Sequence, residues 1–96
     1  MDARSLDEVR DNIDRLDRAI IAPMAERGRF VQQAARFKTS RSDVQAPKRV
    51  EQVIAKVREL AVGAGLEPQV AEAAYRAMVG AFIKVEHSAF ERGTRP

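Results

Sequence analysis

One row of side chains in the first third of the sequence constrains the fold more than any other feature. Its members recur at alternating steps of three and four residues, the spacing of one buried helical face. The row comprises Leu6, Val9, Ile13, Leu16, Ile20, Pro23, Arg27, Phe30, Ala34 and Phe37, all apolar except Arg27. It predicts one long helix, from Leu6 to Lys38.

The length of this helix has a consequence for assembly. Its 33 residues would span about 50 Å, whereas a compact chain of 96 residues has a radius of gyration near 13 Å. The helix therefore overhangs its own domain, and its apolar face needs cover from a second chain. We expect a single all-α domain over residues 1–96 that forms an intertwined helical homodimer, with a protomer that is not stable alone.

Local signals mark the start of the long helix and a break within it. Ser5 and Glu8 form a capping box, which starts the helix near Leu6. Pro23 removes one backbone hydrogen bond and collides with the carbonyl four residues earlier. We predict a kink between Ala19 and Pro23, after which the helix continues.

A polar loop and a second helix follow. Residues 39–46 have turn composition and no periodicity, which predicts a loop that orders over a bound ligand. Pro47 suits the first turn of a helix, and Gly63 and Gly65 end it. The residues of this helix predicted to face water are Lys48, Glu51, Lys56 and Glu59.

The third helix is predicted from Pro68 to about Glu91. Its apolar residues extend most of the way round the helix, which is typical of a segment buried on several sides. It should form the centre of the bundle. The sequence has no strand-like alternation, so each protomer should contain three helices.

Composition excludes several classes of function. The chain has no cysteine and one histidine, which excludes disulfides, thiolate metal sites and a histidine metal cluster. It lacks a signal-like or membrane-spanning apolar run, so we expect a cytoplasmic protein without membrane contacts. The net charge of +3, without a basic run or aromatic interleaving, favours a small anionic partner over nucleic acid.

The cations of the long helix point to an anion site. Arg27 lies in the apolar row, where a guanidinium is costly unless an anion pairs with it. In a straight helix Lys38 would lie near the same face, about 16 Å further along, and Arg10 about 25 Å away from Arg27. An antiparallel second copy could bring its Arg10 to the Arg27 and Lys38 of the first. The alternative is that these side chains lay their stems on the core and keep their charges in water.

An acid in the third helix repeats this pattern. Tyr75, Val79, Phe82 and Glu86 form one row that ends in a carboxyl group. Glu86 either reaches solvent at the end of the helix or faces the same pocket as the cations.

These motifs together resemble a known family. The pattern LDxVRxxIDxLDxxIIxxMAERxxFVxxAxxFK, a loop and APxRV resemble the all-helical chorismate mutases and their sibling, isochorismate pyruvate lyase. The resemblance covers about Leu6 to Phe90, and IDxLD, AER and FK are its most specific segments. It implies an intertwined dimer with two sites, each completed by an arginine of the partner, and a place in aromatic amino acid biosynthesis by the shikimate pathway.

The resemblance also implies roles for five residues. Arg10 is the arginine supplied by the partner, and Arg27 binds a substrate carboxylate within the protomer. Arg49 is the second-helix arginine. Lys38 and Glu86 approach the ether oxygen of the substrate.

The chemistry explains these residue types. Arginines can hold the dianion chorismate in its reactive conformer by paired hydrogen bonds to its carboxylates. Lys38 and a protonated Glu86 can donate hydrogen bonds to the ether oxygen as charge develops there. No metal or cofactor is required.

Besides Pro23, which interrupts a first helix that is unbroken in the family, two positions depart from the chorismate mutase pattern. Ala46 and Val50 stand where mutases carry acids that take the substrate hydroxyl, and APKRV resembles the lyase. The sequence therefore predicts a chorismate mutase, with isochorismate pyruvate lyase as the alternative enzyme and a non-catalytic helical dimer as a second alternative.

Overall fold

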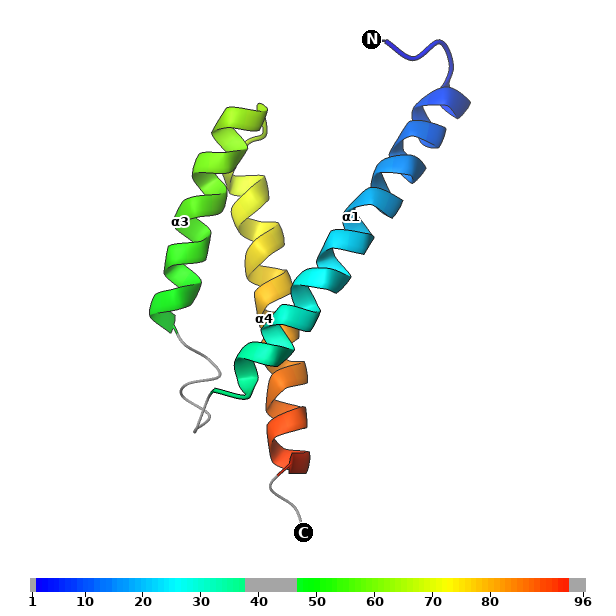
Figure 1. Ribbon diagram of the computed structural model, residues 1–96. Helices are drawn as coiled ribbons and strands as arrows, with labels where there is room; N and C mark the ends of the chain where they lie inside the picture. Colours follow the sequence, from blue (N-terminus) through cyan, green and yellow to red (C-terminus); the bar gives the residue numbers. More distant parts are fainter. Residues whose placement is uncertain (1, 38–46, 94–96) are drawn as a thin grey trace. The chain divides into compact units, whose positions relative to one another are not determined.

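Every regular element in the described part of the chain is an α-helix, as the sequence predicts. The computed structural model describes residues 2–37 and 47–93, although not the side chains of residue 35 and of residues 86–93. Its helices are α1 (Leu6–Ala35), α3 (Pro47–Ala64) and α4 (Pro68–Gly93) (Figure 1). The chain divides into two units, Met1–Val31 and Gln32–Pro96. No helix within the described ranges is long and apolar enough to cross a bilayer.

Helix α1 starts at the predicted cap, with one difference in its hydrogen bonds. The Ser5 Oγ accepts a hydrogen bond from the backbone N–H of Glu8 at 3.1 Å, which satisfies one of the orphan amides of the first turn. The carboxylate of Glu8 reaches back to the N–H of Arg4, at 3.2 Å. In a standard capping box this second bond goes to the N–H of the cap residue itself.

The course of α1 confirms one prediction and corrects another. The helix continues through Pro23, as expected, while the kink at that point stays a prediction. It ends at Ala35 rather than Lys38, because its last backbone bonds span three residues: the N–H of Phe37 donates to the carbonyl of Ala34 at 3.0 Å. Lys38 lies outside the described residues, so its alignment with Arg27 stays a prediction.

The apolar row of α1 is largely exposed in the single chain. Ile13, Leu16 and Ile20 keep 50%, 48% and 55% of their surface accessible. An exposed, contiguous apolar row of this kind marks an interaction surface. The exposure agrees with the expectation that another chain covers this face.

A tight turn joins α3 to α4. Gly65 has φ of +75°. The N–H of Leu66 donates to the carbonyl of Ala61 at 2.8 Å, and the N–H of Gly65 donates to the carbonyl of Val62 at 3.2 Å. These two bonds and the left-handed glycine constitute a Schellman motif. The motif ends α3 close to the predicted glycines, and Pro68 starts the next helix three residues later.

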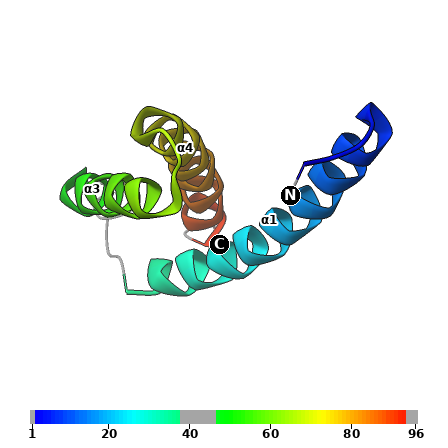
Figure 2. The ribbon, with the colours of Figure 1, turned by 90° about the horizontal axis from the view of Figure 1, so that it is seen from above.

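Helices α3 and α4 lie side by side as a hairpin around a small core (Figures 1 and 2). Val57, Ala61 and Ala71 are buried, with Val53 and Tyr75 packed against them. Such a core is too small to stabilise a domain by itself. The central place expected for the third helix stays a prediction, because Ala71 is the only buried one among the apolar residues of α4 whose side chains are described.

Candidate functional site

Helix α1 carries two of the predicted binding residues. Arg10 is exposed near the N-terminal end of α1, whereas Arg27 is half-buried near the other end. Seventeen residues of helix separate their backbones by about 25 Å. A single copy of α1 therefore does not bring both guanidinium groups to one small molecule.

Arg49 lies in the first turn of α3, where the local charge favours an anion. The turn begins at Pro47, contains Lys48 and Arg49, and holds no acidic residue. Both cations are exposed. The free N–H groups and the dipole at a helix N-terminus also attract negative charge, so cations at this end oppose helix stability while strengthening an anion site.

The structure describes the remaining predicted positions only in part. Lys38 and Ala46 lie outside the described residues, and so does the loop of residues 39–46. Glu86 belongs to α4, but its side chain is not described. Val50 is half-buried on α3, where an apolar side chain offers no acceptor for a substrate hydroxyl.

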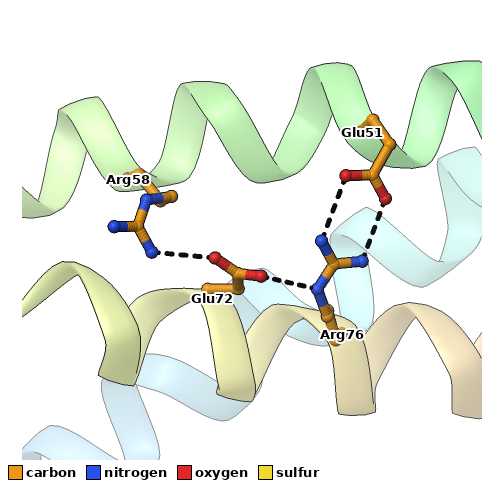
Figure 3. A network of polar contacts seen from close by, with 4 residues as sticks. All are labelled: Glu51, Arg58, Glu72 and Arg76. Atoms are coloured by element: carbon orange, nitrogen blue, oxygen red, sulfur yellow. Dashed lines mark hydrogen bonds and ion pairs between the residues drawn. The ribbon is translucent and has the colours of Figure 1, made fainter.

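The structure reveals a charged network that the sequence analysis missed. It consists of Glu51 and Arg58 from α3 and Glu72 and Arg76 from α4 (Figure 3). The Nη1 and Nη2 atoms of Arg76 donate to the two carboxylate oxygens of Glu51 at 3.0 and 3.1 Å. Its Nε atom donates to Glu72 at 2.8 Å. Arg58 donates to the other oxygen of Glu72 at 2.8 Å.

The network shifts the ionisation of both carboxyl groups. Hydrogen bonds from Arg76 lower the pKa of Glu51 below its ordinary value. Hydrogen bonds from Arg76 and then from Arg58 lower the pKa of Glu72 in the same way. In both cases the favourable charge of Arg76 adds to the effect, and desolvation opposes it. The carboxylate forms are therefore favoured in the folded chain.

Part of the network has a signal in the sequence. Glu72 and Arg76 stand four residues apart on one helix, which favours a pair along its surface. Glu51 and Arg58 stand seven residues apart and share one side of α3. We predicted that Glu51 faces water; its side chain is exposed, but it also pairs with Arg76. The pairing across the two helices depends on how they pack, which no local pattern specifies.

Comparison with known proteins supplies the family. The family model for chorismate mutase type II matches residues 9–87. The chain is also 30% identical over 94 residues to the isochorismate pyruvate lyase of Pseudomonas aeruginosa, in an alignment that covers 98% of this chain and 92% of that protein. All five predicted site residues fall inside the matched segment. On this match, together with the all-helical fold, the chain belongs to the chorismate mutase type II family.

Proposed function

We propose that this protein is a chorismate mutase, an isomerase that rearranges the dianion chorismate to prephenate in the cytoplasm. The observation that carries the proposal is the family match over residues 9–87, which contains a set of cations suited to a small dianion. Arg10, Arg27 and Arg49 all lie on helices. A place in aromatic amino acid biosynthesis by the shikimate pathway follows from the same resemblance.

In the proposed site, arginines bind the substrate and fix its conformation. Arg27 of one protomer and Arg10 of the partner, with Arg49 at the start of α3, hold the two carboxylates. Paired hydrogen bonds from a planar guanidinium fix direction as well as position. The flexible side chain of the substrate is thereby held in the reactive conformer, which removes part of the entropic barrier.

Two further groups stabilise the developing charge. The rearrangement breaks a carbon–oxygen bond, and negative charge accumulates on the ether oxygen in the transition state. Lys38 and a protonated Glu86 donate hydrogen bonds to that oxygen. Because the charge is larger in the transition state than in the substrate, these bonds lower the barrier rather than only tightening binding.

The site is proposed to form between two copies of the chain. The exposed apolar row of α1 and the small core of the α3–α4 hairpin both favour a protomer that is completed by a partner. Most of the stability of a helix in a protein comes from packing of its apolar face. An antiparallel pair of α1 helices would cover the row and bring Arg10 of one copy towards Arg27 of the other.

Isochorismate pyruvate lyase is the second candidate, and two observations favour it. The relative that is 30% identical carries that name. Ala46 and Val50 also remove the two acids expected to bind the hydroxyl of chorismate. The lyase would use the same arginines on a nearly identical dianion and release pyruvate and salicylate.

Separate assays with chorismate and isochorismate test the proposal. We expect the purified protein to form prephenate from chorismate. Release of pyruvate and salicylate from isochorismate, without prephenate formation, would assign the lyase instead. Inactivity with both substrates, in a protein shown to be folded by circular dichroism, would leave a non-catalytic helical dimer. Arg27→Ala is the matched negative control for either activity.

A further inference from the structure

We propose that Arg76 is a positioning residue for Arg49. By holding Glu51, Arg76 fixes the rotation of α3 about its own axis, and with it the place at which Arg49 meets a substrate carboxylate. This inference rests on the proposed function. It adds to that function a residue that touches no substrate.

The register of α3 couples Glu51 to Arg49. Two residues of an α-helix correspond to a turn of about 200°, so the two side chains leave the helix on nearly opposite sides. Val50, between them, is half-buried on the apolar face, whereas Arg49 and Glu51 are exposed on its two flanks. Any rotation of α3 that moves Glu51 therefore moves Arg49 by the same angle.

The fully buried contacts of α3 lie beyond the first turn, in which Arg49 stands. The buried residues of α3 are Ile54, Val57 and Ala61, which all lie further along, and Val50 is only half-buried. Apolar contacts are also non-directional. The two parallel hydrogen bonds between Arg76 and Glu51, in contrast, set direction as well as distance.

Arg76 is itself held in place for this task. Its Nε atom donates to Glu72 one turn earlier on α4, at 2.8 Å. All three guanidinium nitrogens thus have a carboxylate partner, on two helices (Figure 3). A guanidinium fixed on three sides carries little residual rotational freedom, so it can hold Glu51 in one place.

The expected effect follows from helix dimensions. Side-chain tips lie about 5–6 Å from a helix axis, so a rotation of about 10° moves them about 1 Å. A misplacement of about 1 Å in a binding group can cost up to about 100-fold in rate. For a loosened rather than displaced helix we expect a loss of about tenfold in kcat/KM. Because Arg49 binds a carboxylate both before and during the reaction, most of the loss should appear in KM.

The test compares Arg76→Gln with Arg58→Gln, with whichever substrate the wild-type protein turns over. Arg58→Gln is the matched control, since it breaks the other cross-helix pair, nine residues from Arg49, and leaves the bonds of Arg76 intact. We expect Arg76→Gln to raise KM about tenfold and Arg58→Gln to change it less than twofold. Arg76→Lys keeps the charge but not the paired bonds. It should fold as the wild type and still raise KM.

A double-mutant cycle separates positioning from a general loss of structure. In an Arg49→Gln background, adding Arg76→Gln should change kcat/KM less than twofold, because there is no longer an arginine to position. Equal effects of Arg76→Gln and Arg58→Gln, or the full tenfold loss in the Arg49→Gln background, would overturn the inference and leave the proposed function standing. A folded wild-type protein that converts neither chorismate nor isochorismate would overturn the proposed function, and this inference with it.

Discussion

The backbone N–H of Leu66 donates to the carbonyl of Ala61 at 2.8 Å, which closes the end of α3. The bond requires the chain to reverse at Gly65, whose φ of +75° lies in the left-handed region that residues with a Cβ atom avoid. Beyond the neighbouring backbone, a Cβ atom at Gly65 or at Gly63 would meet no other atom of the chain within 4 Å. Steric crowding is therefore equal at the two glycines, and only the backbone conformation differs.

We predict opposite effects of alanine at these two glycines. Gly65→Ala should destabilise the fold by about 1–2 kcal/mol through left-handed strain. Gly63→Ala lies inside α3 and should stabilise it by up to about 1 kcal/mol through helix propensity. Thermal unfolding followed by circular dichroism measures both, and in a domain of this size about 1 kcal/mol moves the midpoint by about 4–8 °C. Equal midpoints for the two variants would contradict the assignment of the turn.

The charged network predicts a loss of stability in acid. Glu51 and Glu72 have pKa values that are lower in the folded chain than usual, chiefly because Arg76 donates hydrogen bonds to them. As the pH falls, the unfolded chain therefore takes up protons before the folded chain does. The contribution of the two carboxylates to the stability of the fold is complete above the ordinary glutamate pKa of about 4.3. It is lost as the pH falls from there through the lowered folded values.

Glu51→Gln tests this dependence. The unfolding midpoint of the wild type should exceed that of the variant at neutral pH, and the difference should shrink as the pH falls through 4. Glu59→Gln removes an exposed carboxylate from the same helix but no part of the charged network, and it serves as the control. A Glu51→Gln difference that is the same at pH 3 and pH 7 would count against a functional ion pair at this position.

The exposed row of α1 predicts a mutation that separates the proposed dimer. Leu16→Lys places a charge in the middle of the row, where the partner would have to desolvate it. We expect a monomeric and largely unfolded protein in analytical ultracentrifugation and circular dichroism. Ala22→Lys adds the same charge at an exposed position on the side of α1 opposite Ile20, and it should remain dimeric. A wild-type protein that is monomeric at micromolar concentration would refute the proposed assembly.

The sequence predicts local structure here better than contacts between helices. Ser5, Pro47 and Pro68 mark helix starts within one residue, because capping and proline geometry act over a single turn. The end of α1 lies three residues earlier than predicted. The prediction missed it because no glycine or proline marks the end of the helix there. The pair of Arg76 and Glu51 lay beyond prediction, because it joins residues 25 apart whose approach depends on helix packing. Arg27 stood out only because it interrupts an apolar row.

Shared sites predict recovery of activity in mixed dimers. Arg10→Ala and Lys38→Ala should each be nearly inactive as homodimers, because each removes one group from both sites. In a mixed dimer of the two variants, one site carries both substitutions and the other carries neither. Activity should therefore return to about half of the wild-type value per dimer. Mixed dimers verified by native mass spectrometry that stay inactive would exclude a site with Arg10 from the partner.

The proposed role of Glu86 predicts how the rate depends on pH. A carboxyl group can donate a hydrogen bond to the ether oxygen only while it is protonated, and its ionised form would repel the charge that develops there. The kcat of the wild type should therefore be highest on the acidic side and fall as Glu86 ionises.

Two substitutions of Glu86 separate hydrogen-bond donation by this side chain from its size and shape. Glu86→Gln has nearly the same size and donates at every pH, so it should abolish the alkaline fall and remain active at neutral pH. Glu86→Ala removes the donor and should lose about 100-fold or more in kcat throughout, the scale seen when one such donor is deleted. Rate profiles from pH 5 to pH 9 for the three proteins provide the measurement. If the Gln variant kept the wild-type decline, the titrating group would be another one, and Glu86 would have no part in stabilising the transition state.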